Sequence, residues 1–583
     1  MEFYGLDKNR NPLKLFTLSL LFNVFILSLT IISGTIKFEV SDDFIMMATV
    51  SGAYNGIPSK YIMFMNPLIG ILISGLYNCI PSINWYVWLQ LIMICISFSI
   101  ILYIGLKMNN KFIIFCMLIF NLIASIDMYQ LMQFTKTATL IISTGFLVFL
   151  YDINIQESSI NIWTTVLFVI CGFLIRSQCF YLTAFIFFIV FLINLMLKQS
   201  FIFSKKSHLI KWDFSKKNRI IKYVLVIFSI LCCVLVFKNY FISHNPEYKQ
   251  YVQYGKIRSQ LIDYPLPEYE FIKDELTDIN ISENDYKCIS TWNLCDSEYF
   301  TKNKLNSILQ IVQKYRSKEF NIKSMLKNMY HRKYWEYLIV WSCIVISISI
   351  FIIDYRRIWQ VMIIGFTCLA LLMYFEYLQR VVYRVEFSII MTCALALISL
   401  LIIKPPQNTI PCNRIGIVLI VILIALRTLL LLPMNCDNVW NSMFYSWVND
   451  IHKYRLKIES KSIKDLNEYM NTNSHYYLMD FNTTIQSYYL AYDPLKSLDR
   501  DYFKNKMYIY GVDFLSPEQI IYYRYKSIIN PIKSLMDPNT YYICNDTSVL
   551  ETFIKEHYDK NFYFKKVKTL NGFDIYKNEL RGE

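Results

Sequence analysis

Two adjacent carboxylates, Asp42 and Asp43, are the residues of this sequence best suited to chemistry. They follow the first long apolar segment directly. Neighbouring acids at the edge of an apolar region lose solvation, and each raises the pKa of the other. Such a pair often serves as a general base or as ligands for a divalent cation. The alternative is an ordinary helix N-terminus, with Ser41 as the N-cap and both acids favoured by the helix dipole.

Only one of the two acids is expected to face a reacting group, because adjacent residues on a helix point about 100° apart. We prefer Asp43 as the base, since Asp42 is closer to Ser41 and better placed to cap the helix. The sequence indicates no cofactor other than a divalent cation that this pair could bind. No zinc-ligand spacing occurs in the sequence, and no other metal site is predicted.

The composition predicts the scaffold that must position these acids. Of the 583 residues, 55% are hydrophobic and 17% are charged, which is too apolar for an ordinary soluble domain. Apolar runs of roughly 20 residues match the thickness of a bilayer. We therefore expect an α-helical polytopic membrane protein. Eleven spans are predicted, near residues 14–34, 84–106, 111–129, 132–150, 159–175, 178–198, 219–240, 335–354, 358–377, 387–403 and 414–433.

The distribution of charge predicts how the spans are oriented. Residues 434–583 hold 19 basic and 19 acidic side chains, so the net charge of +14 lies in residues 1–433. By the positive-inside rule this excess marks cytoplasmic loops and a cytoplasmic N-terminus, in a multi-pass protein of the plasma membrane. It is not a footprint for nucleic acid.

The apolar segment 67–80 is predicted to be a helix at the outer surface rather than a span. If it crossed, the lysine cluster between Lys205 and Lys217 would lie outside the cell, against the charge bias. The external parts are then two loops, at about 35–83 and 241–333, and the tail. The second loop holds Cys288 and Cys295, which either form a disulfide or stay unpaired.

The tail alternates strand-like and helix-like runs. Strand patterns occur at Tyr476–Met479, Lys506–Tyr510 and Tyr541–Cys544, and helix patterns occur around Ser516–Ile528 and Ser548–Tyr558. This alternation is typical of a small α/β domain. The chain is thus divided into a transmembrane domain, residues 1–433, and a soluble extracellular α/β domain, residues 434–583.

A resemblance to a known family adds to this interpretation of the first loop. An acidic pair, then the basic and aromatic step Lys60-Tyr61, then Asn66-Pro67 opening an amphipathic helix, resembles the GT-C superfamily of glycosyltransferases. The layout is similar to the branch with protein O-mannosyltransferases and lipid A aminoarabinose transferases. The motif covers residues 35–90.

The resemblance implies transfer of a sugar from a polyprenyl-phosphate donor in the membrane to a glycan, lipid or protein acceptor outside the cell. It implies a first-loop acid as general base, and a substrate site near Lys60, Tyr61 and Asn66. Asn66 stands where the mannosyltransferase pattern commonly has His. The donor sugar and the acceptor are therefore not carried over.

A phosphate-bearing lipid needs positive charges at the outer membrane face. Arg380 and Arg384 lie in a short external link, where the positive-inside rule predicts few arginines. Guanidinium groups suit phosphate oxygens, although anchoring to lipid headgroups is the competing explanation. His331 and Arg332 precede a span and are further candidates. Charged residues near other outer turns are Asp127, Lys136 and Arg176.

Three other classes of function remain open, one of which is a purely structural or sensory membrane protein whose tail is a binding module. A flippase or transporter for a lipid-linked sugar would typically show charges or broken helices near the midplane, and inverted repeats. A cell-surface polysaccharide polymerase or ligase would share the lipid-linked substrate without needing the acidic pair. Dispensable acids at Asp42 and Asp43 would favour these classes over a transferase of the GT-C type.

Overall fold

The computed structural model of this chain describes residues 11–155, 162–204, 214–316, 322–332, 334, 337–405, 460–480, 483, 492–508, 514–528 and 530–580. The predicted span at 414–433 lies outside these residues.

Long apolar helices dominate the described chain. Eight are long and apolar enough to cross a membrane, as expected of a helical polytopic membrane protein. They correspond to α1 (Pro12–Ile32), α4 (Trp85–Met108), α5 (Lys111–Gln130), α6 (Phe134–Ile155), α8 (Ser177–Ser204), α9 (Phe214–Ser243), α16 (Ile358–Tyr377) and α17 (Tyr383–Ile403). Two further predicted spans correspond to shorter apolar helices, α7 (Ile162–Ile175) and α15 (Leu338–Ile353).

Asparagine residues set the boundaries between α4 and α5. The side chain of Asn84 caps α4, and that of Asn110 caps α5 by accepting from the Phe112 N–H at 3.0 Å. Asn109 ends α4 in the left-handed conformation, with φ 50°. These two residues, Asn109 and Asn110, therefore reverse the chain between two long helices.

The centre of the bundle is formed by α6 and α17, most of whose residues are buried, whereas few of the described residues of α9 and α16 are buried. Glycines allow α7 to approach α6 closely. A Cβ atom at Gly172 would lie 2.8 Å from the carbonyl oxygen of Ala138 and 2.4 Å from Ile142. Close contacts through small residues are a common basis of helix packing in membranes.

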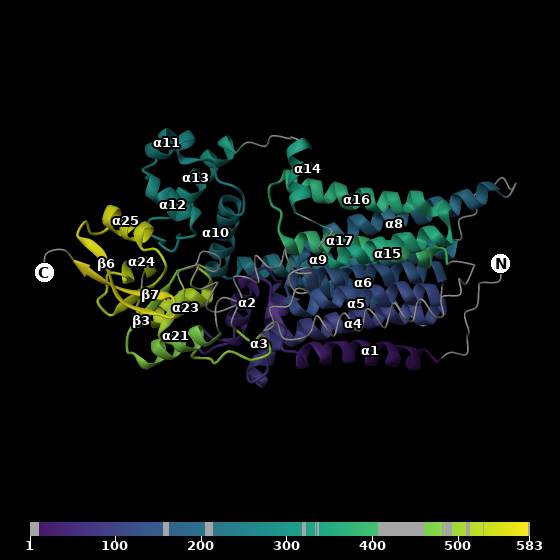
Figure 1. Cartoon of the computed structure of the whole chain (residues 1–583), viewed down its shortest axis with the longest axis horizontal. Helices are drawn as coiled ribbons and strands as arrows, with labels where there is room; N and C mark the ends of the chain where they lie inside the picture. Colours follow the sequence, from purple (N-terminus) through teal and green to yellow (C-terminus); the bar gives the residue numbers. More distant parts are fainter. Residues whose placement is uncertain are drawn as a thin grey trace.

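The first loop folds at one end of this bundle. It contains β1 (Lys37–Phe38), α2 (Ser41–Ser51) and α3 (Pro67–Cys79). Strand β1 pairs in parallel with β2 (Leu131–Met132), which lies in the turn between α5 and α6. Figure 1 shows α2 and α3 between the long helices and the C-terminal sheet. The expected helix at 67–80 is present as α3.

The second loop is helical and lies at the same end of the bundle as the C-terminal sheet (Figure 1). Its helices are α10 (Pro246–Ile262), α11 (Tyr269–Asp278), α12 (Glu283–Ser290) and α13 (Lys302–Tyr315), followed by α14 (Ile322–His331). Cys288 and Cys295 are both buried, and no disulfide joins them in the described part of the chain.

The C-terminal region is a mixed α/β unit, as its sequence pattern predicts. Its five-stranded sheet has the order β4-β3-β5-β7-β6, with β3 parallel to β4 and β5, and β7 antiparallel to β5 and β6. The elements are α21 (Ser460–Thr472), β3 (Tyr476–Met479), β4 (Lys506–Tyr508), α23 (Pro517–Tyr525), α24 (Pro531–Ser534), β5 (Thr540–Ile543), α25 (Ser548–His557), β6 (Phe562–Leu570) and β7 (Phe573–Leu580).

The β6–β7 hairpin is not among the strands predicted from the sequence. Its turn is Asn571-Gly572, with φ values of 48° and 89°. This dipeptide is a strong hairpin signal, because both positions of such a turn require positive φ. The hairpin was therefore readable from the sequence at this turn.

The α/β unit packs directly on the first loop. Asn84 donates to the carbonyl oxygen of Pro494 at 2.8 Å, and the Phe503 N–H donates to that of Ala53 at 3.3 Å. The Ser59 hydroxyl also donates to the carboxylate of Glu518. The two predicted domains thus share a hydrogen-bonded interface that includes the loop of the acidic pair.

Candidate functional site

Asp43 is buried at the start of α2, with no exposed surface. Its Oδ1 accepts hydrogen bonds from the Tyr86 hydroxyl at 2.8 Å and from the Phe134 N–H at 3.2 Å. Its Oδ2 is buried and has no hydrogen-bond partner among the described residues. Asp43 therefore connects α2 to α4 and α6 and has no contact with solvent.

Burial raises the pKa of Asp43 to about 8, and the hydrogen bond from Tyr86 opposes this shift only in part. The neighbouring Asp42 raises the pKa further. Asp43 is therefore mostly protonated at neutral pH. A buried, protonated carboxyl group is poorly placed to accept a proton from a substrate, so the geometry favours Asp42 as the base.

Asp42 points to a different neighbour. Its Oδ2 lies 3.9 Å from Nη2 of Arg384, and its side chain is 17% exposed. The residue that caps α2 is Val40, which forms no side-chain capping bond, and Ser41 is already helical. The expected N-cap at Ser41 is therefore wrong, because the helix begins one residue earlier. The capping role that we expected for Asp42 loses its basis.

Arg176, in the link between α7 and α8, is a cation that the sequence places only near an outer turn. Its guanidinium lies 5.0 Å from the ring centroid of Phe64 and 5.1 Å from that of Phe134. The guanidinium forms no hydrogen bond or ion pair with any described residue. Burial lowers the pKa of Arg176, and the positive charges of Arg384 and Arg380 contribute to the shift.

Lys238, near the end of α9, extends this group of positive charges. It is half-buried, its charge interacts with that of Arg176, and it has no ionic partner in the described part of the chain. Its sequence context does not distinguish it, because a lone lysine at a helix end looks like a membrane anchor. We call Arg176, Lys238, Arg380 and Arg384 the basic cluster.

Arg380 already has a partner within the protein. Its Nη2 lies 2.6 Å from Oδ2 of Asp263, which follows α10, and its guanidinium packs on the ring of Tyr264. Burial raises the pKa of Asp263, whereas Arg380 lowers it. Arg380 thus ties the second loop to the link before α17, whereas Arg384, in the first turn of α17, is the arginine that approaches Asp42.

His331 and Arg332 lie at the end of α14, in different surroundings. Arg332 is 3.4 Å from a carboxylate oxygen of Glu376 and 3.4 Å from one of Glu386. The His331 ring lies beside that of Tyr330, with centroids 6.0 Å apart. Two carboxylates compensate the charge of Arg332, which suits a structural role better than phosphate binding.

Lys60, Tyr61 and Asn66 hold the first loop in place. The Tyr61 hydroxyl donates to Asn245 Oδ1 at 2.6 Å, which joins the first loop to the second. The Lys60 ammonium lies 5.6 Å from the centroid of the Tyr61 ring. Asn66 accepts from the Leu68 N–H at 3.1 Å and so caps α3, as its position before Pro67 suggests.

A buried ionic network supports the strand that leads to the acidic pair. Lys136 on α6 is fully buried and lies 2.8 Å from Glu39 and 2.5 Å from Asp127. The hydroxyl of Tyr383 also donates to Asp127. The sequence indicated Lys136 and Asp127 but missed Glu39, because only the β1–β2 pairing brings this residue to the turn after α5.

Within the described ranges, neither Asp42 nor Asp43 belongs to a group of three or more His, Cys, Asp or Glu side chains that could bind a metal ion. Among those residues, one group of three has ligand atoms within 4.8 Å of one another, and it is Asp285, Glu556 and His557.

No protein-family model matches this chain, and no significant match was found among curated proteins or solved structures.

Proposed function

We propose that this protein is a membrane glycosyltransferase that moves a sugar from a polyprenyl-phosphate donor to a glycan, lipid or protein acceptor at the outer membrane face. Asp42 is the general base in this proposal, and three members of the basic cluster, Arg176, Lys238 and Arg384, bind the donor phosphate. Asp43 is a buried, protonated group that holds α2 against α4 and α6 and so helps to position Asp42.

The observation that carries the proposal is the position of Asp42 beside incompletely compensated positive charge. Arg384 lies 3.9 Å from Asp42, and Arg176 and Lys238 form no ion pair with any described residue. Half-buried cations repel one another and lose solvation unless an anion joins them. A phosphate group supplies that anion, and arginine binds it through paired N–H donors.

The location also suits a lipid-linked donor. The basic cluster lies at ends of α7, α9 and α17, close to the first loop. A polyprenyl chain can then stay in the bilayer while its phosphate reaches the polar end of the bundle. The Lys136 network and the β1–β2 pairing fix the loop that carries Asp42, which keeps the base at a defined distance from the bound phosphate.

The chemistry needs few groups. The acceptor hydroxyl attacks the anomeric carbon while Asp42 takes its proton. The bond from the anomeric carbon to the phosphate oxygen breaks, and the carrier phosphate leaves with its negative charge compensated by Arg176, Lys238 and Arg384. General-base assistance of this kind is typically worth about 10²- to 10⁴-fold in rate.

A transfer assay tests the proposal. Purified protein in liposomes would be given radiolabelled polyprenyl-phosphate sugars and a panel of hydroxyl acceptors. Sugar transfer that depends on Asp42 supports the proposal. Movement of intact donor across the bilayer without transfer would instead indicate a flippase. Chain growth from a diphosphate-linked oligosaccharide that persists in Asp42→Asn would indicate a polymerase or ligase.

A further inference from the structure

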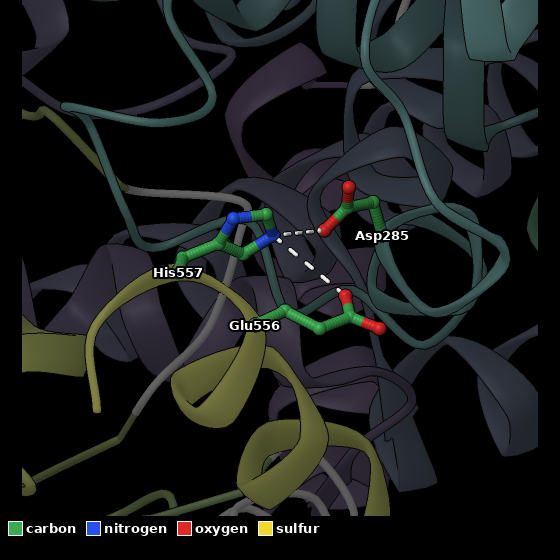
Figure 2. Close-up of side chains that lie close together, drawn as sticks. All are labelled: Asp285, Glu556 and His557. Carbon is green, nitrogen blue, oxygen red and sulfur yellow. Dashed lines mark hydrogen bonds and ion pairs between the residues drawn. The ribbon is translucent and has the colours of Figure 1, made fainter. Parts of the chain in front are cut away.

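A second cluster of chemically active side chains lies far along the chain from the acidic pair. Asp285 comes from the first turn of α12 in the second loop, and Glu556 and His557 end α25 in the C-terminal unit. Figure 2 shows the three side chains converging between the two elements. The cluster therefore joins two regions that are separated by the membrane helices in sequence.

The spacing of the three groups suits a metal ion. His557 Nε2 lies 2.7 Å from Asp285 Oδ1 and 3.8 Å from Glu556 Oε2. Ligands of a tetrahedral zinc ion, at about 2.1 Å from the metal, lie roughly 3.4 Å apart. Shifts of less than an ångström in the side chains would bring these atoms to that spacing.

Neighbouring groups hold the ligands in orientation. The second oxygen of Asp285 accepts from the Ser282 N–H at 2.9 Å and from the Tyr299 hydroxyl at 2.5 Å. The Ser282 hydroxyl also donates to Glu556 at 2.8 Å. The ring of His557 packs on that of Tyr299, with centroids 4.0 Å apart. Such supporting contacts are typical of metal sites, where they fix the direction of each ligand.

The negative charge of the two carboxylates and the partial exposure of the cluster favour a cation that keeps one exchangeable water ligand. Asp285 is 1% exposed, whereas the side chains of His557 and Glu556 are 20% and 35% exposed. Two carboxylates at this interface give a negative site with one side open to water. The nearby Lys304 ammonium lies over the ring of Tyr299, at 3.4 Å from its centroid.

We propose that Asp285, Glu556 and His557 form a zinc site with water as the fourth ligand, which clamps the second loop to the C-terminal α/β unit. One imidazole and two carboxylates are a donor set that Zn²⁺ accepts in four-coordinate geometry. The clamp is independent of the transferase proposal. Its ion stabilises the interface rather than taking part in sugar transfer.

The competing explanation is a hydrogen bond between His557 and Asp285 with no metal. The variant His557→Gln distinguishes the zinc site from the metal-free hydrogen bond, because a glutamine amide still donates to Asp285 but is a poor zinc ligand. Glu556→Gln removes a second ligand at a partly exposed position. The glutamine side-chain oxygen can still accept the hydrogen bond from the Ser282 hydroxyl. His475→Gln is a matched control, since His475 lies in the same α/β unit against Tyr541 and outside the cluster.

The experiment uses the untagged full chain in detergent, treated with a chelator and with its exposed Cys79 and Cys233 alkylated. Zinc affinity is measured by competition with a chromophoric chelator, and Co²⁺ absorption reports the ligand geometry. We expect one zinc per chain, about 100-fold weaker binding in His557→Gln and Glu556→Gln, and no change in His475→Gln. Equal zinc affinity in the parent and His557→Gln would overturn the proposal, as would a parent protein that binds no zinc.

Discussion

The carboxylate of Asp42 and the guanidinium of Arg384 lie 3.9 Å apart, although one belongs to the first loop and the other to the first turn of α17. Their contact places a partly exposed acid beside a group that binds phosphate well. Because Asp43 is fully buried, this contact distinguishes the two acids and supplies the main test of the proposed function.

The first prediction contrasts the two acids. Asp42→Asn should lower the rate of sugar transfer roughly 10²-fold or more, since it removes the proton acceptor. Asp43→Asn should retain most of the activity at pH 7, because an amide resembles the protonated carboxyl group already present. Turnover is measured with purified proteins whose melting temperatures match the parent. Equal losses in both variants would contradict this division of roles.

The second prediction concerns the donor phosphate. Arg176→Ala, Lys238→Ala and Arg384→Ala should each raise the KM for the lipid donor by about 10- to 100-fold, because each removes a charge-assisted hydrogen bond. Arg332→Ala is the matched control. Its guanidinium is already compensated by Glu376 and Glu386, so we expect lower stability with an unchanged KM. A raised KM in the control alone would move the phosphate site to α14.

The third prediction concerns pH and Asp43. Its pKa of about 8 in the folded chain lies above the value of about 3.9 for an unfolded Asp. Between these values the folded state holds a proton that the unfolded state has released, so stability falls as the pH rises through this window. Asp43→Asn should flatten that decline. Melting temperatures from pH 5 to pH 9 measure it, and parallel curves for both proteins would refute the raised pKa.

The fourth prediction addresses the buried network. Lys136→Met should destabilise the protein by about 3–5 kcal/mol, because it leaves Glu39 and Asp127 as buried acids without their cation. The triple variant Glu39→Gln, Asp127→Asn, Lys136→Met should recover much of this loss. Thermal unfolding in detergent tests both variants. If Lys136→Met alone is as stable as the parent, water already solvates Glu39 and Asp127.

The fifth prediction is topological. In a background with Cys79→Ser and Cys233→Ser, a cysteine introduced at Asn306 in α13 or at Lys560 after α25, both exposed, should add labelling by an impermeant maleimide on intact cells over that of the background protein. Lys111→Cys, at the opposite end of the bundle, should react only after permeabilisation. Labelling of Lys111→Cys alone on intact cells would invert the orientation and place the site in the cytoplasm.

The sequence by itself determined the membrane-protein class, the positions of the long apolar helices, and several strands of the C-terminal unit. These depend on local quantities, namely the length of an apolar run, its period and its capping residues. Asn66 before Pro67 predicted the start of α3 for this reason. The β6–β7 hairpin has an equally local signal in Asn571-Gly572.

Only the tertiary structure decided which acid is exposed and which cations have partners. Asp42 and Asp43 are adjacent and chemically identical, so no local pattern distinguishes them. The difference arises because α4 and α6 cover Asp43, whereas Asp42 faces Arg384 on α17. The lack of an ionic partner for Arg176 among the described residues and the meeting of Asp285 with His557 likewise depend on segments far apart in the chain. Burial and charge pairing are sums over such distant neighbours, and a linear sequence does not specify them residue by residue.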